Sequence, residues 1–267
     1  MKQPLMMMHY LKMGSGPALV LLHGFPENSS LWSEVWEALA QEFTLIIPDL
    51  PGAGKSAADG YESIDDYATG IRNILDKEGM GKAIIAGHSM GGYTAFAFSR
   101  LFPGRVAGLV AIHSIPGADS EEKKITRAKT IQLIRKGDSG KSAFISQMIP
   151  NLFANSFKLS HPEIIQQQMG NAMEVRGDNM IGFYQAMMER TDNTQALKNA
   201  PFPVQWIVGM EDNVIDYRKI LEVCHLSGIN FVTFYHNCGH MSMLENPVKL
   251  IGDLRAFGSY CSRHHYA

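Results

Sequence analysis

The chain has 267 residues, is 45% hydrophobic and carries a formal net charge of −2 at pH 7. This length and composition fit one large α/β domain with its own core, with or without a small insertion. The balanced charge excludes the basic field that nucleic acid or an anionic membrane would require, so we expect neither as a partner. The pair Lys123-Lys124 is an isolated basic feature, which we expect on a solvent-exposed face.

Three further features bear on the compartment. The cysteines, Cys224, Cys238 and Cys261, are too few for a disulfide framework and favour a reducing environment. The segment from Met1 to Tyr10 lacks the apolar core and the small-residue cleavage site of a signal peptide. No stretch of the sequence stays apolar for the length of a membrane span. These features predict a cytoplasmic protein.

Strand and helix patterns alternate in the first 112 residues. Before the first long apolar run, the segment from Met6 to Met13 can supply at most one or two short strands. The strands are apolar on both faces and separated by helices, which indicates a mostly parallel sheet covered by helices on both faces. We expect strands at Ala18–Leu22, Phe43–Ile47, Lys82–Ala86 and Val106–Ile112, and helices at Leu31–Leu39, Ile64–Glu78 and Tyr93–Phe102.

The pattern changes between about Ser120 and Ala200, where helical spacing continues without a buried strand. Strand patterns resume afterwards. We therefore assign residues 1–117 and 201–267 to an α/β core domain and residues 118–200 to an inserted helical cap. The alternative is ordinary helical packing on one face of the sheet. The expected helices are Glu121–Arg135, Lys141–Ile149, Pro162–Arg176 and Met180–Arg190, and the later elements are strands Val204–Val208 and Asn230–Tyr235 with helices Tyr217–His225 and Pro247–Phe257.

The segment Gly87-His88-Ser89-Met90-Gly91-Gly92 joins an expected strand to an expected helix. A G-x-S-x-G turn in this context holds its serine in a strained conformation and exposes the hydroxyl above the sheet. The flanking glycines are required because a side chain there would clash with the adjacent strand and helix. Ser89 is therefore the candidate nucleophile, with backbone N–H groups converging beside it.

A serine nucleophile needs a general base, and the base needs an acid that orients it. His240 follows the last expected strand on a loop that contains glycine, and Asp212 follows the strand before it. Because parallel strands place their sites at one shared edge, we predict that Ser89, Asp212 and His240 form the catalytic group. Glu211 and Asp216 are the alternative acids, although Asp216 also fits the N-cap of the next helix.

These motifs and their order resemble the α/β-hydrolase family over about Pro17 to Tyr260. The resemblance implies the α/β-hydrolase fold, Ser89 as nucleophile, His240 as base and Asp212 as orienting acid. It also implies an oxyanion hole from the backbone N–H groups of Phe25 and Met90, and a cap between the sixth and seventh family strands. The resemblance is carried by the segments 22–26, 49–56, 87–92, 209–212 and 239–240.

The turn His23-Gly24-Phe25-Pro26 resembles that of epoxide hydrolases. Those enzymes, like haloalkane dehalogenases, carry an aspartate where this chain has Ser89, so acyl chemistry fits better than alkyl–enzyme chemistry. We therefore predict a serine hydrolase that cleaves a carboxylic ester or a related small acyl substrate through an acyl-enzyme, without a cofactor. The alternatives on this fold are perhydrolase or haloperoxidase-like activity, C–C bond hydrolysis, an aminopeptidase and a thioesterase. The alternative from another class is a small-molecule receptor with slow turnover.

For the substrate pocket we expect the ring of Phe25, His113 after its strand, and Phe183 and Met187 from the cap. Methionine in the wall predicts tolerance of several acyl lengths. Two other patterns are weak. Gly52 to Ser56 looks like a phosphate loop, but Asp49 stands where a P-loop needs its first glycine. His236 and His240 do not make a set of three converging ligands, so we expect no metal.

Overall fold

The computed structural model describes residues 5–264. Within that range the strands are β1 (Tyr10–Met13), β2 (Ala18–Leu22), β3 (Thr44–Pro48), β4 (Ala83–His88), β5 (Val106–Ile112), β6 (Val204–Gly209) and β7 (Asn230–Tyr235). They form one sheet of seven strands in the order β1-β3-β2-β4-β5-β6-β7. β1 is antiparallel to β3, and every other neighbouring pair is parallel. The predicted mostly parallel sheet is confirmed.

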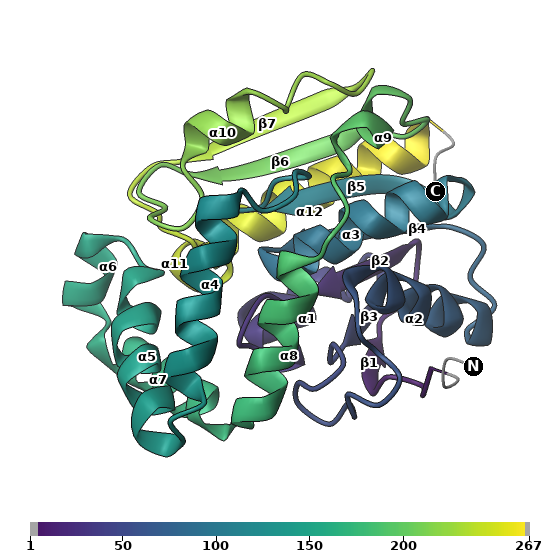
Figure 1. The fold of residues 1–267 in the computed structure, drawn as a ribbon. Helices are drawn as coiled ribbons and strands as arrows, with labels where there is room; N and C mark the ends of the chain where they lie inside the picture. The colour runs from purple at the N-terminus through teal and green to yellow at the C-terminus, as the bar shows by residue number, and fades with distance from the viewer. Residues whose placement is uncertain (1–4, 265–267) are drawn as a thin grey trace.

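Helices cover both faces of this sheet (Figure 1). On one face α1 (Ser33–Leu39) packs against α12 (Pro247–Arg263), and on the other α2 (Ile64–Lys77) packs against α3 (Met90–Leu101). β4 and β5 are buried along their whole length between these layers, which is why their sequences are continuous apolar runs. The short elements are η1 (Ser29–Trp32), η2 (Pro103–Arg105), α10 (Tyr217–Leu221) and α11 (Ser242–Glu245).

A block of helices separates β5 from β6. Its helices pack largely on one another, with α4 against α5 and α8, and α5 against α7. Two of its short helices were not predicted, because five or six residues are too few to show a helical period. The block consists of α4 (Glu121–Ile134), α5 (Asp138–Asn151), α6 (Asn155–Ser160), α7 (Pro162–Glu174), α8 (Gly177–Met188) and α9 (Thr194–Lys198).

This helical block contacts the core at specific points. The side-chain amide of Asn179 donates to the Gly52 carbonyl at 2.8 Å. The ring of Phe183 lies 5.9 Å from that of Phe25 and 6.5 Å from that of Tyr67, centroid to centroid. These contacts dock α8 over the loops at the ends of the parallel strands, where the candidate catalytic residues lie. None of the helices within residues 5–264 has both the length and the apolar character needed to cross a bilayer.

Candidate active site

Ser89 is the single residue between β4 and α3. Its backbone has φ 50° and ψ −113°, a conformation that residues other than glycine rarely adopt. Its N–H donates to the Ile112 carbonyl of β5 at 3.0 Å, and its carbonyl accepts from the N–H of Gly92 at 2.9 Å. The neighbouring strand and the first turn of α3 therefore hold the strained residue in place.

Two glycines allow the chain to make this turn. A Cβ atom on Gly87 would lie 2.2 Å from the carbonyl oxygen of Gly91 at the start of α3. A Cβ atom on Gly91 would lie 2.3 Å from the carbonyl oxygen of Leu22 in β2. Both distances are far inside van der Waals contact with backbone, which cannot move aside. The predicted need for glycine on both sides of the serine is confirmed.

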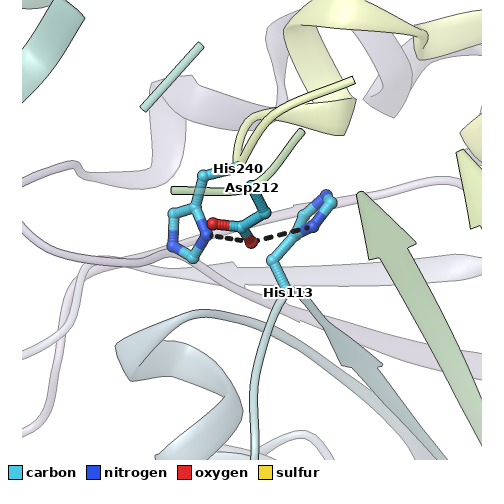
Figure 2. A group of neighbouring side chains, drawn as sticks. All are labelled: His113, Asp212 and His240. Carbon is cyan, nitrogen blue, oxygen red and sulfur yellow. Dashed lines mark hydrogen bonds and ion pairs between the residues drawn. The ribbon is translucent and has the colours of Figure 1, made fainter. Parts of the chain in front are cut away.

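The structure brings His240 and Asp212 together, as Figure 2 shows. Nδ1 of His240 donates to Oδ2 of Asp212 at 2.7 Å, and Oδ1 accepts from the N–H groups of Val214 and Ile215 at 2.7 and 2.9 Å. Burial by itself would raise the pKa of Asp212, but the charge of His240 and the hydrogen bonds from His113 and His240 lower it. An ionised Asp212 fixes the hydrogen on Nδ1 of His240 and leaves Nε2 free to accept a proton.

The other acids considered from the sequence lie elsewhere. Oδ1 of Asp216 accepts from the N–H of Arg218 at 2.9 Å, which caps α10 as expected. Glu211 makes no side-chain hydrogen bond to His240 or His113 in the described part of the chain. Asp212 is therefore the acid that geometry pairs with His240.

His113 approaches the same carboxylate from the end of β5. Its Nδ1 lies 3.5 Å from Oδ2 of Asp212 and 3.3 Å from the N–H nitrogen of Gly209 (Figure 2). Burial lowers the pKa of His113, against the opposing effect of Asp212, which favours the neutral ring. A neutral imidazole carries one ring hydrogen. Depending on the tautomer, Nδ1 therefore either donates to the carboxylate of Asp212 or accepts from the N–H of Gly209. We expected His113 to line the pocket, but it packs behind Asp212, because β5 and β6 are neighbours and end side by side.

His113, Asp212 and His240 also form a group of metal-ligand type, since one donor atom from each lies within 4.8 Å of the others. A metal would require both nitrogens to be deprotonated and to face the ion. The 2.7 Å contact between His240 and Asp212 has instead the length of a hydrogen bond to an acceptor-only group. This donor set fits a base with its orienting acid better than it fits a metal ion.

The loop that carries His240 is tied to the helical block. The N–H of His240 donates to the Leu152 carbonyl at 2.6 Å. The carboxylate of Glu245 accepts from the N–H of Gly239 at 3.0 Å and from the N–H of Ala154 at 2.9 Å. The segment after α5 and the loop after β7 therefore share one hydrogen-bond network.

Ser89 and His240 line one cavity of about 210 Å³. Phe25 and Met187, both expected in the pocket, also line it. Phe183 does not line it, because its ring is buried behind that of Phe25 and supports it from the side. The sequence did not identify the other lining residues, which are Tyr93, Lys123, Thr126, Arg127, Thr130, Met148, Leu152, Tyr184 and Val214.

Two backbone N–H groups at this site have no acceptor. Neither Phe25 N–H nor Met90 N–H donates to another group within residues 5–264. The turn that carries Phe25 lies against the serine turn, since a Cβ atom on Gly24 would be 2.7 Å from Nδ1 of His88. His23 braces it: its Nδ1 is 2.7 Å from the Gly24 carbonyl oxygen, and its Nε2 accepts the Leu50 N–H. Both N–H groups are therefore left without an acceptor, as an oxyanion site requires.

Glu27 is a buried acid that the sequence reasoning missed. Neither of its carboxylate oxygens has a hydrogen-bond partner in the described chain, and Oε2 lies 4.0 Å from Nδ1 of His88. Burial raises the pKa of Glu27 to about 7, against the opposing charge of His240. In the sequence, its only signal is its place directly after Pro26 in the turn that carries Phe25.

Replacing this acid by its neutral isostere, Glu27→Gln, should remove part of the pH dependence of folding. Glu27 has a folded-state pKa of about 7 against an ordinary value of 4.5, so the folded state binds the proton more tightly. The contribution of Glu27 to the free energy of unfolding therefore falls as pH rises from about 4.5 to about 7. The fall amounts to about 3 kcal/mol, at ~1.4 kcal/mol per pKa unit. Urea unfolding at about pH 5 and about pH 8 measures this effect. Relative to the wild type, the free energy of unfolding of the variant should be higher at about pH 8 than at about pH 5.

The matched control is Glu37→Gln, a change of the same kind at an exposed position on α1. In this control, the free energy of unfolding should change between the two pH values by the same amount as in the wild type. If Glu27→Gln behaves like this control, Glu27 is ionised in the folded protein over the whole range.

The comparisons with known proteins agree with this architecture. The family model described as alpha/beta hydrolase fold matches residues 17–247. An uncharacterized protein of Mycobacterium tuberculosis is 42% identical over 266 residues, which covers 91% of this chain and 76% of that protein. A soluble epoxide hydrolase of Corynebacterium sp. is 40% identical over 112 residues, covering 41% of this chain and 39% of the enzyme.

Among solved structures, an esterase from Thermogutta terrifontis superposes with a TM-score of 0.89 at 28% sequence identity. The match covers 95% of this chain and 93% of that esterase. The family model spans most of the chain, and the mostly parallel seven-stranded sheet agrees with it. The chain belongs to the alpha/beta hydrolase fold family.

Proposed function

We propose that the protein is a serine hydrolase that cleaves carboxylic esters or related small acyl compounds through an acyl-enzyme. One observation carries this proposal: Ser89 and His240 line the same cavity, and His240 is held from its far side by an ionised Asp212 at 2.7 Å. A strained serine, a base with a free Nε2 and an orienting acid are the parts that acyl transfer requires.

In the proposed reaction, Oγ of Ser89 attacks the carbonyl carbon while Nε2 of His240 takes the hydroxyl proton. The negative charge that develops on the carbonyl oxygen is bound by the free N–H groups of Phe25 and Met90. Donors of this kind contribute about 3 kcal/mol each at comparable sites. His240 then protonates the leaving alcohol, and later activates the water that hydrolyses the acyl-enzyme. Asp212 stabilises the imidazolium at both stages.

The similarity to an epoxide hydrolase does not extend to the nucleophile. Epoxide opening by that route uses a carboxylate, which leaves an ester on the enzyme, whereas position 89 is a serine. A serine adds to a carbonyl carbon, and the two free N–H groups suit the oxyanion that results. Ester hydrolysis is therefore better supported than epoxide opening.

We also propose that residues 118–200 act as a cap over this site. The cavity is lined jointly by core residues, such as Phe25 and Ser89, and by residues of the helical block, such as Met148 and Met187. Ligand pockets commonly form where two such parts meet. The joint lining favours a cap over helices that merely cover one face of the sheet.

The test is steady-state hydrolysis of p-nitrophenyl esters of graded acyl length. We expect many turnovers per protein molecule and activity across several lengths, because flexible methionine side chains adapt to the acyl chain. In this series Met187→Ala should change the relative kcat/KM of long and short esters by about tenfold, the usual scale for one methylene in an apolar pocket. Met188→Ala should not, because Met188 faces the groove between α4 and α8 outside the cavity.

A single stoichiometric release of nitrophenol without turnover would instead identify a slow receptor. A length profile that Met187→Ala and Met188→Ala leave equally unchanged would mean that the helical block does not shape the acyl site.

A further inference from the structure

Among the described residues 5–264, two cationic side chains and no acidic one line the cavity at Ser89. Lys123 and Arg127 lie one turn apart on α4, and both line it. The remaining lining residues are aromatic, aliphatic or hydroxyl-bearing, apart from His240. We expected Lys123 on a solvated face, but α4 packs beside α8 (Figure 1). In this position the Lys123 side chain lines the cavity.

Arg127 shares its buried counter-ion with a second arginine. Its Nε donates to Asp119 at 2.5 Å, and Nη1 of Arg190 donates to the other oxygen of Asp119 at 2.6 Å. Nε and Nη2 of Arg190 donate to the Gly117 carbonyl, whereas the two Nη nitrogens of Arg127 bond to nothing in the described chain. Asp192, another acid near Arg190, is exposed. One buried carboxylate thus balances two guanidinium groups.

Lys123 and Tyr93 also line the cavity, and neither the Lys123 ammonium nor the Tyr93 hydroxyl has a hydrogen-bond partner among residues 5–264. Lys123 is half-buried, and its ammonium forms no ion pair there. Burial by itself would raise the pKa of Tyr93, but the charges of Lys123, Arg190 and Arg127 lower it. A partly desolvated excess of positive charge is costly unless an anion joins it.

We propose that the ester substrate carries a second, anionic group, a carboxylate, which binds Lys123 and Arg127 while the ester carbonyl lies at Ser89. This inference rests on the proposed function, because it names the class of ester that the site accepts. The planar guanidinium of Arg127 presents paired N–H donors that match a carboxylate, and the ammonium of Lys123 adds a point charge. The substrate class is a short monoester of a dicarboxylic acid, or a short ester of a hydroxy acid.

The size of the cavity supports a short substrate. At about 210 Å³ it is smaller than the roughly 300–1,000 Å³ of pockets that hold drug-sized ligands. The carboxylate and the ester carbonyl therefore lie only a few bonds apart. A long neutral acyl chain would leave both cations unpaired in the filled cavity.

The experiment compares the hydrolysis rates of charged esters and of their neutral isosteres. Hydrolysis is followed by the proton that the acid product releases. One pair is monomethyl glutarate and its amide counterpart, methyl 4-carbamoylbutanoate, with the charge on the acyl side. The other is acetoxyacetate and acetoxyacetamide, with the charge on the alcohol side. We expect kcat/KM at least about tenfold higher for the charged member of one pair, the scale of a hydrogen bond to a charged group. The preference should shrink with added salt.

Variants of α4 identify the residues responsible. Lys123→Gln should reduce the ratio of charged to neutral kcat/KM by about tenfold. The matched control is Lys124→Gln, the adjacent lysine, which pairs with Glu121 at 2.8 Å and lies outside the cavity. It should keep the wild-type ratio. Equal kcat/KM within both pairs, or an equal loss in both lysine variants, overturns the proposal.

A binding measurement separates this inference from the proposed function. Calorimetric titration of Ser89→Ala with glutarate should show binding that the double variant Ser89→Ala, Lys123→Gln loses. If p-nitrophenyl acetate is turned over but glutarate does not bind and charged esters are not preferred, the anion site is wrong and the hydrolase assignment stands. If glutarate binds through Lys123 but no ester is hydrolysed, the anion site stands and the hydrolase assignment fails.

Discussion

Replacing Ser89 by alanine is expected to lower kcat for ester hydrolysis by about 10⁴–10⁶, to the residual level that binding and oxyanion donors alone supply. The hydroxyl oxygen is the atom that forms the proposed acyl-enzyme, and within residues 5–264 no other serine lines the cavity that holds His240. A fluorophosphonate should therefore label the wild type once, at Ser89, and should not label the variant. Intact-mass measurement with peptide mapping checks both points.

The control is Ser99→Ala, a serine of α3 whose hydroxyl donates to the Phe96 carbonyl in its own helix at 2.8 Å. This variant should keep labelling and turnover. Thermal unfolding of Ser89→Ala should remain cooperative, because alanine fits the same turn. Continued labelling of the folded Ser89→Ala protein would mean that the nucleophile is another residue.

Asp212→Asn is expected to reduce kcat by about 10⁴ while the fold survives. An asparagine amide at this position can donate to Nδ1 of His240, which would favour the tautomer with hydrogen on Nε2. That nitrogen could then no longer take the proton of Ser89. The rate of fluorophosphonate labelling should fall in parallel with kcat, since both depend on the same proton transfer.

Asp216→Asn is the companion variant, because Asp216 belongs to the same loop and caps α10. It should keep most of the activity, since asparagine also serves as an N-cap. Near-normal activity in Asp212→Asn combined with loss in Asp216→Asn or Glu211→Gln would show that a different carboxylate orients the base.

The sequence was sufficient for the parts of the molecule whose requirements are local. The serine turn depends on glycines that contact the backbone on either side, and such needs are visible in a short motif. The buried strands can be recognised in the sequence as continuous apolar runs. The relation of Asp212 to His240 follows from chain order and from the rule that parallel strands end at one edge.

The parts that escaped prediction depend on how distant segments dock. The sequence of α4 has the charges of a solvated helix, and only its packing against α8 turns Lys123 and Arg127 toward Ser89. The direction of His113 depends on β5 and β6 being neighbours. Glu27 looks like an ordinary turn residue until the serine turn is packed over it.

The hydrogen bonds from Leu152 and Ala154 to the His240 loop bear on how relatives of this protein can be recombined. Exchange of whole insertions between homologues is an attractive route to new specificity, because such a block begins and ends in surface loops. In this protein such a graft would also replace the Leu152 carbonyl, which accepts a hydrogen bond from the backbone N–H of His240. A chimaera that carries a foreign helical block but keeps residues 152–154 from this chain should retain the wild-type reaction rate. A chimaera in which the whole block is exchanged should lose that rate together with the original specificity.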